Sequence, residues 1–414
     1  MSAPIRALAL VATITVFASI YGCSAQFPLL AACKADAFGE TKLRARLFAC
    51  TAAIRQGAKG GDLEKVLAYR GESYRQLSDD DHAKADFDAA LRIDPKDTMA
   101  LNDRGLVYIS QDQFALALAD FDAAISTSPN DVFPYSNRGI ADRFNRDFDQ
   151  AIHDENRAIE LNPNWAEPWA NRGYAYNGKR QWEMALADFD NSLRLAPGNA
   201  WALQGRAGAE RGKGRPDLAL KDLNQVLAKW PRNEGALLGR AGVYADKGDF
   251  DDALRDVNQA IALHPRQPGP YASRSEVYLR QGAHAGALAD AQTAVALRPD
   301  DAATLTVRCS ARAVIGADLA AALADCQQAL ALRPNWVPAL DSLAFIRFRQ
   351  GHFDQAISGY DAVLAREPQS PAARFMRGVA RLRAGDKAGA ADITAATAAD
   401  PRIPGLYAAF GVKP

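Results

Sequence analysis

Proline recurs at a nearly constant step along most of this chain of 414 residues. The step is 34 residues over the first seven of these prolines and then 35, 34 and 33. A fixed period of this size is typical of a solenoid built from one repeated supersecondary unit. The chain is therefore treated as ten internal copies, numbered so that position 32 of each is one of these prolines: Pro95, Pro129, Pro163, Pro197, Pro231, Pro265, Pro299, Pro334, Pro368 and Pro401.

The composition is that of a chain that can bury a hydrophobic core. Hydrophobic residues make up 48% of it, and 49 basic side chains are matched by 49 acidic ones. A single globular domain of this length is uncommon, whereas a repeat array has no such limit on size. Because nucleic acids and anionic lipids attract a basic excess, the zero net charge argues against nucleic acid as a partner and against polybasic attachment to a membrane.

The first 25 residues have the features of an export signal. The 14-residue apolar run Ala7–Ile20 is too short for a membrane span of about 20 residues and suits the apolar part of a signal peptide. Small residues favour cleavage after Ala25. Alternatively, the sequence around Cys23 resembles a bacterial lipobox, which would place lipid on Cys23, although Tyr21 departs from that pattern. An uncleaved anchor is the third possibility, and each of them predicts an exported protein of the periplasm or cell envelope.

The chain has five cysteines. Apart from Cys23 they form two pairs, each separated by 17 residues: Cys33 with Cys50, and Cys309 with Cys326. In an exported chain such pairs predict disulfide bonds, and the alternative is that they are free buried thiols.

Two positions of the repeat are restricted to small side chains. Position 8 holds only Gly, Ala, Ser or Cys, and position 20 holds Ala in nine copies, which lets two helix backbones approach closely. Position 24 is mostly large, and position 4 is large and apolar or aromatic. Position 11 is Tyr in five copies, as in Tyr74 and Tyr108.

This pattern resembles the tetratricopeptide repeat family. The resemblance covers residues 64–403 and implies an all-α, right-handed solenoid of about ten helical hairpins, with a first helix such as 100–111 and a second such as 115–128. The proline should end the second helix, because it lacks an N–H and its ring clashes with the preceding turn. Residues 26–63 are expected to form a degenerate capping hairpin and residues 404–414 a short C-terminal cap.

Position 7 carries Arg in nine of the ten repeats, where the family usually has Leu, and position 23 carries Asp in nine. The same repeat lacks both and has Leu343 and Gly359 instead. We therefore expect each Arg to pair with the Asp of its own hairpin, because pairing between neighbours would offset the two exceptions by one repeat. The alternative is a row of solvated charges, and on either interpretation these residues serve stability and not catalysis.

No group of residues has the spacing of a catalytic, metal or cofactor site. The five histidines are dispersed, and the sequence has no His-Glu-x-x-His, no Cys-x-x-Cys pair and no phosphate-binding loop. We expect no enzyme activity, no cofactor and no bound metal.

In this family the first helices line a concave surface, with positions 2, 5, 6, 9, 12 and 13 facing the groove. In repeats 2 to 5 these positions combine amide, aromatic and charged side chains, and they predict a peptide-binding groove formed by Asn102, Asp103, Phe133, Asn137, Arg143, Phe144, Asn171, Tyr174, Asn177, Trp201 and Arg211. Aromatic rings would bury side chains of an extended peptide, and the amides would bond its backbone. The alternative is that the aromatic residues pack between neighbouring first helices.

Repeats 5 and 6 have Gly at both positions 6 and 9, namely Gly205, Gly208, Gly239 and Gly242. Two glycines inside one helix weaken it. Three interpretations are open: the glycines admit a ligand backbone closely, they form a soft point of the solenoid, or they merely leave a permissive surface.

These features lead to the expectation of a non-catalytic scaffold or adaptor of the bacterial cell envelope, which binds a protein or peptide partner through the concave groove. The alternative is a structural or assembly component that uses the edges of the solenoid or associates with itself. Membrane attachment is expected only through lipid on Cys23.

Overall fold

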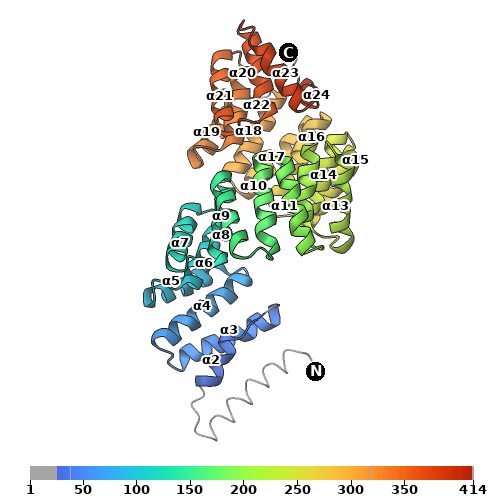
Figure 1. The fold of residues 1–414 in the computed structure, drawn as a ribbon. Coiled ribbons are helices and arrows are strands. Elements are labelled where there is room, and N and C mark those ends of the chain that lie inside the picture. Colours follow the sequence, from blue (N-terminus) through green and yellow to red (C-terminus); the bar gives the residue numbers. More distant parts are fainter. Residues whose placement is uncertain (1–25, 38, 317, 413–414) are drawn as a thin grey trace. The chain divides into compact units, whose positions relative to one another are not determined.

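The structure, a computed structural model, describes residues 26–412 apart from residues 38 and 317. The expected signal segment, residues 1–25, and Cys23 within it lie outside the described residues. All regular elements in the described ranges are α-helices (Figure 1), which confirms the predicted all-α class. No helix in this part of the chain combines the length and the hydropathy needed to cross a membrane.

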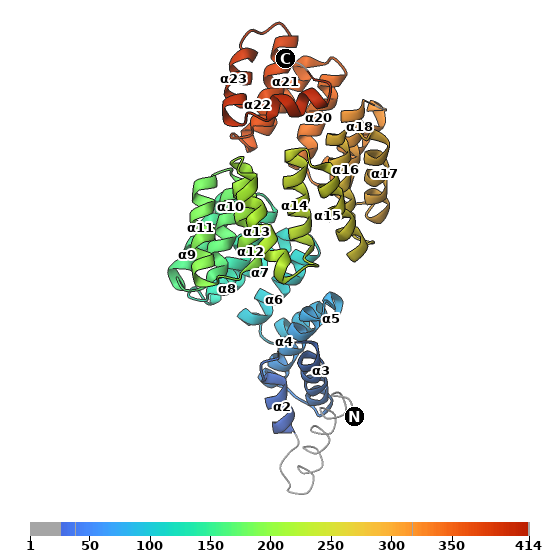
Figure 2. The same ribbon diagram turned by 90° about the vertical axis from the view of Figure 1, so that its right-hand side faces the viewer.

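The helices follow one another as a first and a second helix in each repeat, preceded by an N-terminal hairpin and followed by one short helix (Figures 1 and 2). In chain order they are α2 (Gln26–Lys34) and α3 (Glu40–Arg55); α4 (Gly60–Gln76) and α5 (Asp80–Ile93); α6 (Thr98–Ser110) and α7 (Phe114–Thr127); α8 (Val132–Phe144) and α9 (Phe148–Leu161); α10 (Ala166–Gly178) and α11 (Trp182–Leu195); α12 (Ala200–Gly212) and α13 (Pro216–Lys229); α14 (Glu234–Lys247) and α15 (Phe250–Leu263); α16 (Pro268–Gln281) and α17 (His284–Leu297); α18 (Ala302–Ile315) and α19 (Leu319–Leu332); α20 (Val337–Arg349) and α21 (Phe353–Arg366); α22 (Pro371–Arg383) and α23 (Gly389–Ala399); and α24 (Ile403–Ala409).

The chain forms two compact units. Unit 1 contains the described residues up to Gly178 together with Arg194–Ala196, and unit 2 contains Lys179–Leu193 and the chain from Pro197 onward. Within each unit the first helix of a repeat contacts the first helix of the next one: α4, α6, α8 and α10 in unit 1, and α12 to α22 in unit 2. No comparable contact joins the second helices of neighbouring repeats in the described chain. The first helices therefore line the inner face of each unit.

Capping side chains set where several helices begin. Asp97 accepts hydrogen bonds from the backbone N–H groups of Met99 at 2.9 Å and Ala100 at 3.1 Å. Helix α6 consequently begins at Thr98, two residues before the predicted start at residue 100. Asn199 caps α12 in the same way.

The turn between the two helices of every repeat passes through one residue in the left-handed conformation. This residue is position 15, and its φ lies between 58° and 87° in all ten repeats. Repeats 5 to 10 place Gly there, whereas the first four place Ser78, Asp112, Arg146 and Arg180. A side chain in this conformation costs about 1–2 kcal/mol. The hairpin geometry therefore imposes the turn even where the sequence lacks glycine.

The small residue at position 8 makes room for the large residue at position 24 of the same hairpin. A Cβ on Gly71 would lie 2.8 Å from the Phe87 ring, and one on Gly105 would lie 2.6 Å from the Phe121 ring. Both rings are fully buried. The small residue at position 8 was expected to let two helix backbones approach. In these two hairpins the glycine makes room for an aromatic ring.

The predicted pairing of Arg with the Asp of the same hairpin is confirmed in eight repeats. The two members of the ninth predicted pair, Arg172 and Asp188, belong to different units. In each of the eight pairs Nε and Nη2 of the guanidinium donate to the two carboxylate oxygens, at 2.6–2.9 Å: Arg70–Asp86, Arg104–Asp120, Arg138–Asp154, Arg206–Asp222, Arg240–Asp256, Arg274–Asp290, Arg308–Asp325 and Arg377–Asp392.

Arginines at position 7 also reach the preceding repeat, which the sequence analysis missed. The Nη1 group of Arg104 donates to Asp88 at 2.7 Å, and that of Arg240 donates to Asn224 at 2.7 Å. Five further repeats make the same contact with Asp or Asn at position 25. The planar guanidinium therefore links its own two helices and also ties successive hairpins together.

Two disulfide bonds join the predicted cysteine pairs. Cys33 is bonded to Cys50 between α2 and α3, and Cys309 to Cys326 between α18 and α19. All four residues are fully buried. Cys309 and Cys326 hold positions 8 and 24, where other repeats pair a small residue with a large one. Oxidation of these pairs in the cell stays a prediction.

Candidate functional site

The predicted groove residues lie on first helices, nine in unit 1 and two in unit 2. In unit 1 they lie on α6, α8 and α10, and in unit 2 they lie on α12.

Amide side chains link neighbouring first helices in unit 1. The Nδ2 group of Asn137 donates to Oδ1 of Asn102 at 2.8 Å, and the Nδ2 group of Asn102 lies 3.4 Å from Asp103 Oδ1. Asp103 is buried, which raises its pKa to about 6, although the Arg75 guanidinium works against the rise. Asn102 and Asn137 are half-buried and line the inner face, whereas Asp103 lies beneath it.

Asn171 does not line an open groove. It is only 7% exposed, and its amide donates to the Ser136 hydroxyl at 3.2 Å. Ser136 in turn donates to Glu155 of α9 at 3.1 Å. The position therefore belongs to a polar network buried between α8, α9 and α10, which the sequence analysis did not anticipate. Sequence reasoning missed Glu155, which stands at position 24, where every other repeat has a side chain that is not charged.

Exposed aromatic rings lie at both ends of α8. Phe133 is 54% exposed and meets the Trp165 ring edge-on at 5.1 Å. Phe144 is 45% exposed, and its ring centroid lies 4.5 Å from the Arg143 guanidinium carbon. Because Phe133, Asn137 and Phe144 are spaced i, i+4 and i+11, all three lie on one face of the helix.

Arg143 lies between Phe144 and the next first helix. Its guanidinium carbon is 5.5 Å from the centroid of the Tyr174 ring on α10. Burial lowers the pKa of Arg143 and raises that of the Tyr174 hydroxyl. Asn177 is half-buried one turn further along α10. The inner face of α8 and α10 thus combines a cation, aromatic rings and amides.

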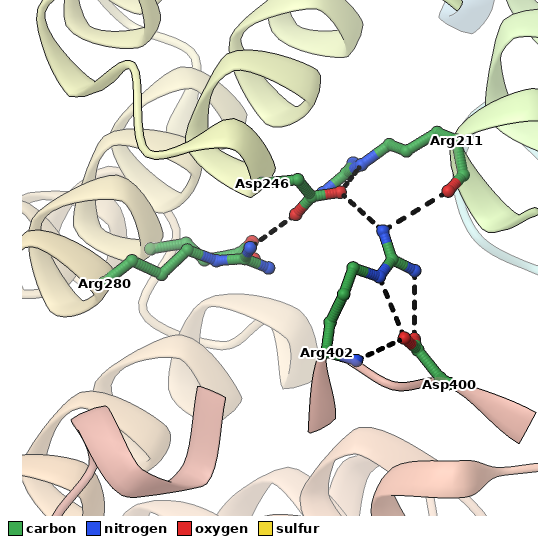
Figure 3. Close-up of polar contacts among 6 residues, drawn as sticks. Arg211, Asp246, Arg280, Asp400 and Arg402 are labelled. Atoms are coloured by element: carbon green, nitrogen blue, oxygen red, sulfur yellow. Dashed lines mark hydrogen bonds and ion pairs between the residues drawn. The ribbon is translucent and has the colours of Figure 1, made fainter. Parts of the chain in front are cut away.

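In unit 2 the two predicted groove residues differ in their surroundings. Trp201 is exposed in the first turn of α12. Arg211, at the other end of α12, is not a free groove cation, since Nε and Nη2 donate to the two oxygens of Asp246 at 2.6 and 3.1 Å (Figure 3). A Cβ on Gly242 would lie 2.5 Å from Arg211 Nη1. This glycine therefore makes room for a guanidinium of the chain itself, which none of the three interpretations of the glycines foresaw.

The wider cluster around Arg211 was also missed. Asp246 binds Arg280 of α16 and Arg402, which follows α23 (Figure 3). Asp246 and Arg280 occupy position 13 of their repeats. Extending the comparison of groove positions to repeats 6 and 7 would have found these two, but not Arg402.

Known proteins share this architecture. A tetratricopeptide repeat protein from Parabacteroides merdae has a TM-score of 0.50 and 22% sequence identity, over 60% of this chain and 98% of that chain. A chain of the APC/C hetero-tetramer Cut9–Hcn1 has a TM-score of 0.52 and 14% identity, over 90% of this chain and 83% of its own. At these identities the likeness shows the fold alone. No curated protein sequence matched the chain.

The family assignment rests on the sequence itself. A tetratricopeptide repeat model matches residues 70–132, 205–270, 243–302 and 343–404, which together make up more than half of the chain. Proteins of this family generally act as protein-interaction scaffolds. The matched ranges and the repeated hairpins together show that this chain belongs to the tetratricopeptide repeat family.

Proposed function

We propose that this protein is a non-catalytic scaffold or adaptor of the bacterial cell envelope, which binds a protein or peptide on the inner face of unit 1. The observation that carries the proposal is the exposed stripe on α8, where Phe133 and Phe144 flank Asn137. Two half-exposed aromatic rings on one helix face, next to an arginine, have the composition of a protein-binding surface.

The dimensions of the stripe suit a short extended peptide. The 11 residue steps from Phe133 to Phe144 span about 16 Å along the helix. An extended segment of about five residues covers that distance. Its side chains would pack on the two rings, and its backbone would bond the amides of Asn102 and Asn137.

The placement in the envelope rests on the sequence. An apolar run typical of an export signal precedes the repeats. Paired cysteines suit an exported protein, because disulfide bonds persist outside the reducing cytosol.

A cross-linking pull-down from intact envelopes tests the proposal. We expect Phe144→Ala to weaken partner binding by about 2 kcal/mol or more, which is about thirtyfold in affinity. Leu116→Ala is the matched control, because Leu116 is 50% exposed on the second helix α7 of the same unit. If recovery is unchanged by Phe144→Ala and lost with Leu116→Ala, the protein acts through its edge, as in the alternative assembly role.

A further inference from the structure

Residues 400–412, here called the return segment, follow the last repeat hairpin and lie against first helices of earlier repeats in unit 2. The segment contains α24 and ends at Val412. Arg402 at one end contacts repeats 5 and 6, and Phe410 near the other end contacts repeats 7 to 9.

Arg402 reaches an acceptor pair on the inner face. Its Nη1 group lies 3.4 Å from the backbone carbonyl of Arg211 and 3.5 Å from Asp246 Oδ2 (Figure 3). Arg402 and Arg211 are 191 residues apart in the chain. The other two donors of Arg402, Nε and Nη2, bind Asp400 at 2.9 Å each.

Two other arginines hold the acceptor Asp246 in place independently of Arg402. Asp246 is already bound by Arg211 and by Arg280, from the first helices on either side. Burial alone would raise the pKa of Asp246, but the two arginines outweigh it and hold the pKa below its usual value. Asp246 is therefore a fixed anion, and it stays paired if Arg402 leaves.

The Phe410 end lies in apolar surroundings. Its ring packs against a buried cluster that contains Leu279 on α16 and Ala311 on α18, and Val314 on α18 packs against the same cluster. The Phe410 carbonyl accepts a hydrogen bond from Arg349 Nη1 at 3.3 Å. The return segment thus makes the three kinds of contact that a bound peptide makes: a charged side chain, an aromatic anchor and a backbone bond.

We propose that the inner face of repeats 5 to 9 is a binding site for a protein segment that carries an arginine and, eight residues later, an aromatic residue. In the free chain the return segment occupies this site. A partner with the same chemistry binds by replacing it. The inference deepens the proposed function, because it also takes the partner to be a protein, but it concerns a separate surface in unit 2.

The segment combines three residues buried in the core of the last repeats with a larger part that is exposed or half-buried. Among residues 401–412 only Ile403, Tyr407 and Val412 are buried, and Arg402 is 44% exposed. Asp400 neutralises Arg402 locally, so its departure strands no buried charge. Tyr407 stacks on Phe375 at 5.5 Å, and a partner would have to cover this surface in turn. Segments with few buried contacts open at lower free energy than the packed hairpins beneath them.

Binding of a labelled peptide tests the proposal. The probe is a fluorescent peptide of residues 399–414, titrated into the full chain and followed by anisotropy. We expect the variant Arg402→Ala/Phe410→Ala to bind it at least about tenfold more tightly than the wild type, because the internal segment no longer competes. Equal affinity for the two proteins, or no binding to a variant of unchanged helicity, would overturn the proposal.

Two controls locate the binding. Val314→Glu, added to the opened variant, places a charge beside the apolar cluster against which Phe410 packs, and it is expected to abolish peptide binding. Phe144→Ala in unit 1 is expected to leave it unchanged. Phe144→Ala is also the test of the proposed function, so the two proposals can be told apart. Unchanged partner capture by this variant counts against the site in unit 1, and unchanged peptide affinity of the opened variant counts against the site in unit 2.

Amide hydrogen exchange of the wild type covers the case in which the opened variant does not fold. We expect the amides of α24 to exchange at least about tenfold faster than those of α22, because the return segment opens without its repeat. If α24 and α22 exchange at the same rate, the segment is a permanent part of the last repeat and the proposal is wrong.

Discussion

At the residue scale, the left-handed backbone conformation of position 15 carries a conformational cost in each hairpin turn. Position 15 is left-handed in every repeat, and at Gly248, with φ of 85°, an added Cβ would meet nothing within 4 Å. Gly248→Ala should therefore lower the free energy of unfolding by about 1 kcal/mol through backbone strain alone. Urea denaturation measures the change. Gly269→Ala is the control, since Gly269 is helical and equally open. An equal loss at Gly269 would contradict this explanation.

A buried acid in repeat 3 should make stability depend on pH. Burial raises the pKa of Glu155 well above its usual value, and the hydrogen bond from Ser136 only partly opposes the rise. Between the unfolded pKa of about 4.3 and the higher folded value, the native state holds a proton that the unfolded chain has lost. This contribution therefore makes the protein less stable as pH rises through that window.

Glu155→Gln removes the titration and keeps the size of the side chain. We expect the variant to be more stable than the wild type at pH 8 and about equally stable at pH 4. Thermal unfolding at the two pH values measures the difference. A variant that is less stable than the wild type at pH 8 would show that the ionised carboxylate stabilises the network.

At the element scale, the arginine–aspartate pair holds the two helices of a hairpin together. Asp256 is buried and accepts two hydrogen bonds from Arg240, from Nε at 2.7 Å and from Nη2 at 2.8 Å. Asp256→Ala should cost about 2–3 kcal/mol, because it leaves a mostly buried guanidinium without its carboxylate. The double variant Arg240→Leu/Asp256→Ala should lose less, since repeat 9 has Leu343 at position 7 and lacks the acid. A double variant that is less stable than the single one, measured in urea, would refute this account.

The disulfide in repeat 8 performs the same task covalently. Cys309 and Cys326 close a loop of 17 residues between α18 and α19. In the chain-entropy model a loop of this size contributes about 3 kcal/mol. We expect reduction of the exported protein to lower its free energy of unfolding by about this amount, and the native protein to show no free thiol among the four paired cysteines. A titration that finds four free thiols would show that neither disulfide bond forms.

The sequence predicted the hairpins and the pairs, because these depend on contacts inside one repeat that the chain repeats about ten times. The contact of position 25 with arginine was missed because some repeats have Asp there and others have Asn. Only the side-chain oxygen that both residues share accepts the hydrogen bond. The burial of Asp103 and Asn171 was not predictable, because it depends on how closely successive first helices approach. The contact of Arg402 with Arg211 depends on curvature accumulated over several repeats, which no single position encodes.

At the scale of the whole molecule, the two units present different inner faces. In unit 1 the aromatic stripe on α8 is exposed. In unit 2 the return segment lies on the inner face of repeats 5 to 9 and links it to the last hairpin. In a repeat protein most contacts join only neighbouring repeats, so this contact sets the return segment apart from the rest of unit 2.

A partner is expected to bind the inner face formed by the first helices. Amide hydrogen exchange of the full chain, alone and with the partner recovered by cross-linking, tests this expectation. We expect the partner to slow exchange in α6, α8 and α10 and to leave α7 and α9 unchanged. Slowed exchange confined to the second helices α7 and α9 would show that the partner binds elsewhere.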